Sequence, residues 1–308
     1  MNDYANLIVG VVCAGFGGDL FVRGAVGLAH CARVSPGIIG ATVAAFATSS
    51  PELSVSINAA LAGEPKIALG DALGSNILNV ALILALALVI SGIQCPRSSV
   101  KRDFPLALLV PLITGGLLLD GELSRVDGLL MLVLFVLWLV MSIIEARTQR
   151  NSAEKVLAEH RGWLVVISCT AGLGLLVAAG SLIVTGARGI AVSFGIDEFI
   201  IGATIVAVGT SVPELATTVM AKLRGHDEVG LGTILGSNIF NGLLVVSVAS
   251  IIHPITVEWR EVVISLIFGI VALAAAYPPR NGLIDRRRGV FLLLLYAAYL
   301  TLILHWKA

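Results

Sequence analysis

Two glutamates of this chain stand in otherwise apolar sequence, each inside a motif that occurs twice. Residues 48–52 read Thr-Ser-Ser-Pro-Glu and residues 210–214 read Thr-Ser-Val-Pro-Glu. Residues 74–77 and 236–239 both read Gly-Ser-Asn-Ile, and an asparagine follows two positions later in each copy. All of these pairs are 162 positions apart. Carboxylate, hydroxyl and amide oxygens are the ligands that hard cations prefer, so the repeated motifs indicate cation chemistry.

Helical spacing places these oxygens together. Thr48 and Glu52 are four residues apart, as are Ser75 and Asn79, so each pair shares one helix face. The second copy repeats this spacing. Neither motif contains His or Cys, the ligands typical of Zn²⁺ and Cu⁺. The donor set therefore favours Ca²⁺ and Na⁺.

A proline precedes each glutamate. Pro51 has no N–H to donate to the carbonyl of Ala47, and Pro213 has none for Gly209. Freed backbone groups within a membrane are tolerated only where protein, water or an ion satisfies them. We therefore expect the two carbonyl oxygens that lose their helical partner to lie beside the carboxylates.

The charge balance of the motifs points to exchange. Two carboxylates at low dielectric repel each other unless a cation or proton compensates them. Neither motif contains Lys or Arg. One divalent cation neutralises the pair, and two or three monovalent ions can replace it at a shared site.

Composition requires a membrane setting. Of the 308 residues, 57% are hydrophobic and 13% charged, and the mean hydropathy is +0.97. Runs such as residues 81–90 do not alternate as the strands of a membrane barrel do. The sequence predicts an all-α membrane protein with ten transmembrane helices of about 20 residues. The expected spans are Tyr4–Ala29, Pro36–Ala62, Ile67–Ile93, Phe104–Leu119, Val126–Glu145, Gly162–Gly186, Glu198–Leu223, Val229–Ile252, Glu261–Tyr277 and Gly289–Leu304.

The distribution of Lys and Arg orients these spans. Most of them fall on one side, which the positive-inside rule makes cytoplasmic. Both termini are then outside, residues 147–161 form a cytoplasmic linker, and the location is the cell (inner) membrane. Residues 1–146 and 162–308 are two repeats of five spans, and because five is odd they are inverted. Inverted repeats are an architecture of secondary transporters.

At these motifs the chain resembles the calcium/cation antiporter superfamily, and within it the prokaryotic sodium/calcium exchanger type. The resemblance covers nearly the whole chain. It implies exchange of Ca²⁺ for Na⁺ by alternating access, in which the first and sixth spans slide past the other eight. It also implies ten metal-ligating residues: Glu52, Glu214, Thr48, Thr210, Ser49, Ser211, Ser75, Ser237, Asn79 and Asn241.

One departure from the family pattern concerns Asn241, whose position is often an aspartate in these exchangers. With amides at both Asn79 and Asn241 the site has one formal negative charge fewer, which leaves ion stoichiometry and potassium dependence open. Proton-coupled relatives usually carry a Gly-Asn-x-x-Glu-His element, which residues 74–79 do not match. Sodium coupling is favoured. The alternatives are a Ca²⁺/H⁺ antiporter that uses the same glutamates and a passive cation channel.

Other polar residues have two interpretations. Asn76 and Asn238 either approach the ions or hydrogen-bond between helices, and Asp71 either lines an access path or caps a helix segment. Asp19 and Arg23 are expected to form an ion pair within one helix. No phosphate-binding loop is present, so we expect neither an enzyme nor ATP as the energy source. The expected partners are Ca²⁺, Na⁺ or H⁺ and the lipid bilayer, without cofactor or nucleic acid.

Overall fold

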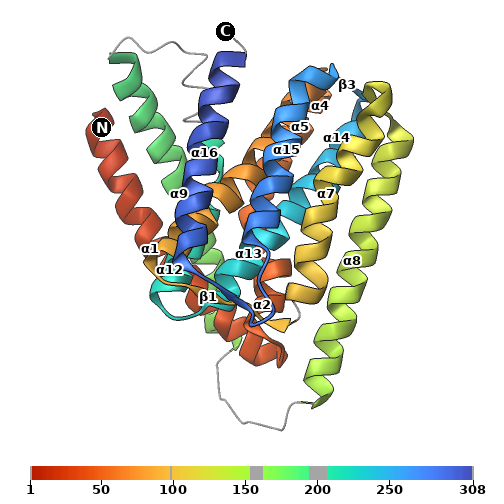
Figure 1. Cartoon of the computed structure of the whole chain (residues 1–308). Coiled ribbons are helices and arrows are strands. Elements are labelled where there is room, and N and C mark those ends of the chain that lie inside the picture. Colours follow the sequence, from red (N-terminus) through yellow and green to blue (C-terminus); the bar gives the residue numbers. More distant parts are fainter. Residues whose placement is uncertain (1, 98, 153–161, 194–206, 307–308) are drawn as a thin grey trace.

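The computed structural model describes residues 2–97, 99–152, 162–193 and 207–306. Within them the chain is mostly long helices, many of which run between the two ends of the molecule (Figure 1). In chain order the helical elements are α1 (Asp3–Ala32), α2 (Pro36–Ile39), η1 (Gly40–Ala44), α3 (Ala45–Thr48), α4 (Ser50–Leu61), α5 (Pro65–Leu78), η2 (Asn79–Leu84), α6 (Ala85–Ile90), η3 (Ser99–Asp103), α7 (Phe104–Leu117), η4 (Leu118–Asp120), α8 (Arg125–Ser152), α9 (Gly162–Ser193), α11 (Ala207–Thr210), α12 (Val212–Leu223), α13 (Asp227–Ile239), η6 (Phe240–Val245), α14 (Val246–Ile252), α15 (Trp259–Ala276) and α16 (Arg286–Trp306).

The expected membrane spans largely correspond to these helices. Within the described part of the chain, seven helices are long and apolar enough to cross a membrane, and a bent pair, Pro36–Thr48 with Ser50–Leu61, is an eighth candidate. The expected seventh span contains α11 and α12, and its residues 198–206 lie outside the described part of the chain. The expected tenth lies within α16. A helical membrane protein is thereby confirmed, whereas the count of ten spans stays a prediction.

Short strands are the one addition to the expected all-α architecture. β1 (Ile93–Gln94) pairs antiparallel with β4 (Leu283–Ile284), and β2 (Glu122–Leu123) pairs with β3 (Ile255–Thr256). Each ladder joins a loop of the first half of the chain to a loop of the second. The pairing satisfies backbone groups where helices end, because such groups must find partners when they leave a helix.

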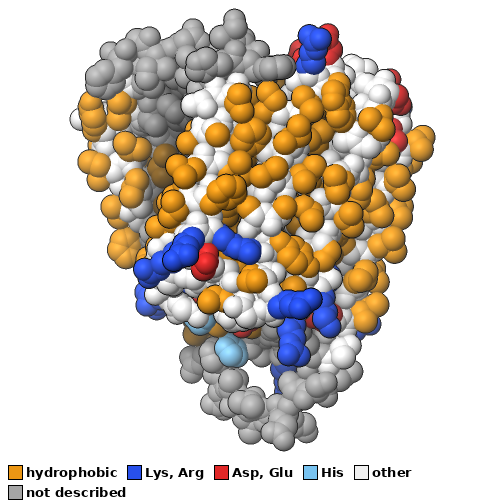
Figure 2. All heavy atoms as spheres, viewed as in Figure 1, with side chains coloured by type: hydrophobic (Ala, Val, Ile, Leu, Met, Phe, Trp, Pro, Cys, Tyr) orange, Lys and Arg blue, Asp and Glu red, His pale blue; other side chains and the backbone are white. Residues whose placement is uncertain are grey.

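The outer surface fits a lipid environment. Figure 2 shows hydrophobic side chains over the middle of one face and Lys and Arg gathered toward its lower end. α8 is typical, because Leu129, Val133 and Leu137 all point outward and are about half exposed. Bulky apolar side chains in such numbers favour contact with acyl chains rather than water.

Two continuous helices form the buried centre. The segments Pro65–Ile90 and Asp227–Ile252 are the most enclosed of the candidate spans. Each widens into a π-helical turn beginning at or next to the repeated asparagine, at Asn79 in η2 and at Phe240 in η6. Wide turns of this kind are often found at functional sites. The two buried segments therefore place the Gly-Ser-Asn motifs in the middle of the molecule.

α1 and α9 form a separate packed pair. Gly10, Gly17 and Gly24 recur every seven residues along α1 and all lie against α9. A Cβ atom at Gly24 would stand 2.7 Å from the Sγ atom of Cys169, so the two helices approach too closely for a larger residue. A seam of small residues allows this approach between helices in membranes.

Candidate cation site

Both Thr-Ser-x-Pro-Glu motifs form the same local structure. The helix stops at Thr48 and restarts at Ser50, with Ser49 at φ −89° and ψ 7° between α3 and α4. Ser211 has φ −89° and ψ 8° between α11 and α12. The first break bends the segment by 44°. Each glutamate then lies in the first turn of the new helix, where the N-terminal end of the helix dipole favours negative charge.

The carbonyl oxygen that Pro51 leaves without its helical partner accepts a hydrogen bond from a neighbouring side chain. The Oγ atom of Ser50 donates a hydrogen bond to the Ala47 carbonyl oxygen at 2.7 Å. The oxygen that Pro51 leaves without its helical partner is therefore satisfied at least in part by the protein itself. Ser50 has no equivalent in the second copy, where Val212 takes its place. There the Gly209 carbonyl oxygen lies against α9, 2.8 Å from where a Cβ atom of Gly180 would stand.

The two glutamates lie together in the interior. Glu52 and Glu214 are each 1% exposed, and the charge of Glu214 acts on Glu52, as does that of Asp71. Within the described residues neither glutamate forms an ion pair with Lys or Arg. Buried negative charges without a counter-charge are strongly unfavourable, so the arrangement calls for a compensating cation or proton.

Hydroxyl groups from both halves surround Glu214. Its Oε1 atom accepts hydrogen bonds from Ser49 at 3.1 Å and from Ser237 at 3.3 Å, and the Thr48 hydroxyl lies close to it. Thr48 also donates to the carbonyl of Ala45 at 3.3 Å. The second-half carboxylate therefore contacts the first-half motif directly, as the repeat required.

Glu52 has a different environment. Neither of its carboxylate oxygens receives a hydrogen bond from another described residue, although the Ser211 side chain lies nearby. Seven oxygen atoms of the expected ligands are buried without a partner among the residues that the structure describes. Ca²⁺ usually takes six to eight oxygen ligands, so this donor set suits a hard cation as substrate. These atoms are Glu52 Oε1 and Oε2, Glu214 Oε2, Ser75 Oγ, Ser211 Oγ, Asn79 Oδ1 and Asn241 Oδ1.

The structure decides between the two interpretations of Asn76 and Asn238. Each Nδ2 atom donates to the other residue's backbone carbonyl, at 3.1 Å in both directions. Their hydrogen bonds join the two halves where α5 and α13 meet. The interhelical interpretation is confirmed. The Nδ2 atom of Asn79 also donates to Oδ1 of Asn238, at 3.0 Å.

The remaining polar residues that the sequence analysis singled out have the following positions and contacts. Thr210 ends α11 and is half-buried. Asp19 and Arg23 form the expected pair at 2.9 Å, and Arg224 adds a second contact with Asp19 at 2.7 Å. Asp71 stays near the site rather than in a cap, with one buried oxygen that lacks a partner.

Two buried hydroxyls were missed by the sequence analysis. Ser56 and Thr218 each lie four residues after a glutamate, on the same helix face, and neither hydroxyl has a partner. They are also 162 positions apart, like the other pairs. The 162-residue offset could have revealed this pair. It was not included in the motif because the two positions carry different residues, Ser and Thr.

Two glycines of α13, Gly232 and Gly236, let this helix pack closely against the first half of the chain. A Cβ atom at Gly232 would stand 2.9 Å from the Ala41 backbone nitrogen, and one at Gly236 would stand 2.6 Å from Ala45 Cβ. At these two glycines α13 therefore approaches the first half closely, as small residues allow between helices in membranes. For Gly70 and Gly74 the corresponding neighbours in the other repeat are positions 203 and 207, and residue 203 lies outside the described part of the chain.

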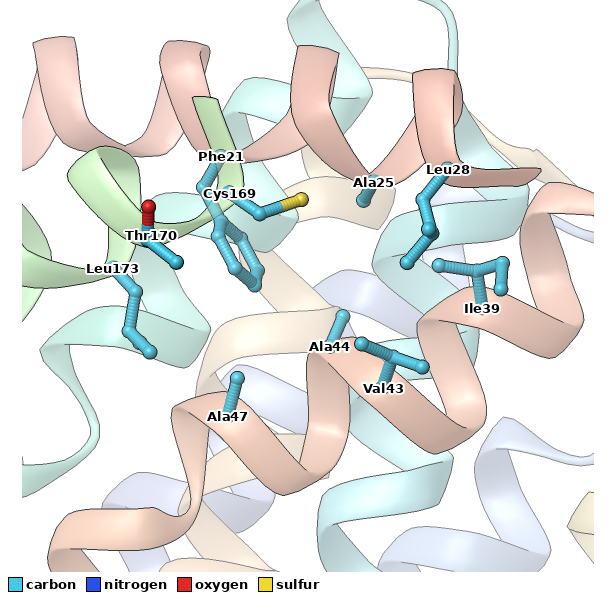
Figure 3. A pocket seen from close by; sticks show the side chains of 10 residues that line it. All are labelled: Phe21, Ala25, Leu28, Ile39, Val43, Ala44, Ala47, Cys169, Thr170 and Leu173. Carbon is cyan, nitrogen blue, oxygen red and sulfur yellow. The ribbon is translucent and has the colours of Figure 1, made fainter. Parts of the chain in front are cut away.

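An apolar crevice of about 180 Å³ lies beside the site, between the α1/α9 pair and the first-half motif helix (Figure 3). Phe21 and Leu28 of α1, Leu173 of α9 and Val43 of η1 point toward it. The α1/α9 pair therefore packs less completely against η1 and α3 than its two helices pack against each other.

Comparisons with known proteins agree on one family. The family model described as sodium/calcium exchanger protein matches residues 3–144 and 164–305. A protein of Alkalimonas amylolytica, provisionally named the antiporter CaxA, is 40% identical over 256 residues, or 80% of each chain. The inner membrane protein YrbG of Escherichia coli is 34% identical over 312 residues, or 96% of each chain.

A solved structure has the same fold. The sodium-calcium exchanger NCX_Mj, soaked with 2.5 mM Na⁺ and 10 mM Sr²⁺, matches with a TM-score of 0.84 and 30% sequence identity. The match covers 97% of this chain and 98% of that chain. The similarity therefore extends over both motifs and the helices that carry them.

Proposed function

Because the chain belongs to the sodium/calcium exchanger family, we propose that it exchanges Ca²⁺ for Na⁺ across the membrane by alternating access. The observation that carries this proposal is a set of seven oxygens that are buried without a partner among the described residues, three from two carboxylates without a counter-charge there and four from serine and asparagine side chains. Two formal charges match one Ca²⁺. When Ca²⁺ leaves, Na⁺ ions can neutralise the same carboxylates, which couples the two fluxes.

The proposed ligands are the ten residues of the sequence motifs. Glu52 and Glu214 supply the charge, and the serine and amide oxygens supply neutral ligands. The Thr48 and Thr210 positions complete the set at the ends of α3 and α11. The hydrogen bonds from Ser49 and Ser237 to Glu214 support this assignment, because they bring both halves to one carboxylate.

The proposed architecture is ten spans in two inverted repeats, residues 1–146 and 162–308, joined by a cytoplasmic linker over 147–161. Support comes from the equivalent breaks at Ser49 and Ser211 and from the reciprocal bonds of Asn76 and Asn238. The start of α1 and the end of α16 lie toward one end of the molecule in Figure 1, and the Lys and Arg of Figure 2 toward the other. The basic end would face the cytoplasm.

The moving part would be the α1/α9 pair. It packs tightly within itself through the glycines of α1, and the apolar crevice separates part of it from η1 and α3. The apolar lining of the crevice offers no hydrogen bond that such a movement would break, whereas the ion pair between Asp19 of α1 and Arg224 would have to open or follow the movement. Displacement of the pair would open the site to one side of the membrane at a time.

Transport in proteoliposomes tests the coupling. With Na⁺ inside and none outside, we expect uptake of radioactive Ca²⁺ that stops when the Na⁺ gradient is removed. An imposed proton gradient alone should drive little uptake. Uptake driven by protons and indifferent to Na⁺ would instead indicate a Ca²⁺/H⁺ antiporter, and flux without any counter-ion would indicate a channel.

Acidification is expected to weaken Ca²⁺ binding. A proton on Glu52 or Glu214 removes one of the two charges that compensate the divalent ion, so protons and Ca²⁺ compete for the same oxygens. Binding of radioactive Ca²⁺ to the purified protein should weaken progressively from about pH 8 to about pH 5. A constant affinity over that range would contradict a buried carboxylate pair as the site.

Exchange should not require K⁺, because the amide of Asn241 adds no charge for a further cation. We expect Asn241→Asp to change the dependence on monovalent ions more than Ca²⁺ selectivity, since a third buried carboxylate needs another ion or a proton. Asn79→Asp is the symmetry-matched variant. Ca²⁺ uptake against Na⁺ concentration, with and without K⁺, checks this. An absolute K⁺ requirement in the unmodified protein would refute it.

A further inference from the structure

The orientation of the side-chain amides at the contact between α5 and α13 follows from which of their atoms can donate a hydrogen bond and which can only accept one. The backbone carbonyl of Asn76 can only accept a hydrogen bond, so the atom of Asn238 that faces it at 3.1 Å must be the donor Nδ2. The other side-chain atom of Asn238 is therefore Oδ1, which can only accept. Asn79 faces this oxygen at 3.0 Å and must present its own Nδ2.

This sequence of donors and acceptors determines the orientation of Asn79. With Nδ2 held by Asn238, the Oδ1 atom of Asn79 points elsewhere, and it is buried without a hydrogen-bond partner. Left alone, an amide could rotate by 180° and present its NH₂ group to a cation, which repels it. The Asn238 oxygen prevents that rotation.

The second repeat lacks the equivalent contact. Asn76 donates to the backbone carbonyl of Asn238, yet its own Oδ1 has no partner. Both side-chain atoms of Asn241, the counterpart of Asn79, are also without partners. The two repeats thus share the bonds between Asn76 and Asn238, but one ligand amide is held in place and the other is not.

We propose that Asn238 is a positioning residue of the cation site, which holds Asn79 so that its carbonyl oxygen faces the transported ion. The proposal rests on the proposed function for the identity of the ion. It does not make Asn238 a ligand. Outer partners of metal ligands commonly alter affinity by tenfold to a hundredfold when they are removed.

The symmetry of the chain offers a matched control. Asn238→Ala and Asn76→Ala each remove one amide bond to a backbone carbonyl at the same contact, but only Asn238→Ala releases Asn79. We expect Asn238→Ala to weaken Ca²⁺ binding by about tenfold or more and Asn76→Ala to change it by less than about twofold. Both should lower the melting temperature of the ion-free full-length protein. Asn238→Leu replaces Asn238→Ala if the cavity prevents folding.

A second background separates positioning from general damage. In Asn79→Asp both terminal side-chain atoms are oxygens, so either of them can face the ion without being held in place. The Oδ1 atom of Asn238 would also repel the new carboxylate. Adding Asn238→Ala to Asn79→Asp should therefore leave Ca²⁺ affinity unchanged or raise it. A loss of about tenfold in both backgrounds, or equal losses for Asn238→Ala and Asn76→Ala, would overturn the positioning role while leaving exchange intact. An unmodified protein that binds neither radioactive Ca²⁺ nor Na⁺ would overturn the proposed function as well.

Discussion

Glutamine in place of either Glu52 or Glu214 should reduce Ca²⁺ transport to background. Each change keeps the size and shape of the side chain and removes one of the two buried charges that would neutralise Ca²⁺. Removal of an outer partner alone costs about tenfold to a hundredfold in metal affinity. Loss of a charged ligand at low dielectric should therefore cost more than about a hundredfold. Uptake of radioactive Ca²⁺ into proteoliposomes is the measurement.

Folding of the same variants should be preserved. Glu52 has no hydrogen bond to its carboxylate, and glutamine at 214 can still accept from Ser49 and Ser237. Removing an uncompensated buried charge stabilises an ion-free protein, so its melting temperature should stay equal or rise. The rise on adding Ca²⁺ should disappear. Near-normal exchange by either variant would place the site elsewhere.

Glu261→Gln is a suitable control for these experiments. Glu261 lies at the start of α15, where it forms a capping box and an exposed ion pair with Lys66 at 3.2 Å. Glutamine preserves the cap, and exposed ion pairs contribute little to stability. The variant should transport normally. A loss as large as that of the buried glutamates would mean that any Glu→Gln change damages the protein.

The sequence was sufficient to predict the features that follow from local chemistry and from the repeat. Both glutamates are buried near each other as expected. The single helix face expected for Thr48 and Glu52 is interrupted, because one helix ends at Thr48 and the next begins at Ser50. The hydroxyls of Ser49 and Ser237 reach Glu214 because both copies of the motif meet at one point.

The features that the sequence did not reveal depend on tertiary contacts or on differences between the copies. Ser50 occupies the Ala47 carbonyl through a side chain that the second copy lacks. Arg224 reaches Asp19 across a separation of 205 positions, and no periodicity encodes that meeting. The orientation of Asn79 depends on a chain of donors through Asn238, whereas the sequence is identical in both repeats at these asparagines.

Packing around Gly236 leads to the last prediction, a large loss of stability in Gly236→Ala. The added methyl group would meet the Ala41 backbone and stand 2.6 Å from the Cβ atom of Ala45, and a backbone contact cannot be relieved by a rotamer change. Overpacking of a core typically costs about 1–3 kcal/mol, and rigid backbone on both sides favours the upper part of that range. The forced separation of α13 from η1 would also move Ser237 away from Glu214.

Gly116→Ala is the matched control, because a Cβ atom at Gly116 of α7 has no heavy atom within 4 Å. Alanine there should be neutral or stabilise by up to about 1 kcal/mol, since glycine is the weaker helix former. Melting temperature and Ca²⁺ uptake, measured together, distinguish the two positions. We expect Gly236→Ala to lower both and Gly116→Ala to lower neither. If Gly236→Ala melted and transported like the unmodified protein, α13 and the first-half motif could separate freely, and the close contact between the two repeats would not be what holds the carboxylates together.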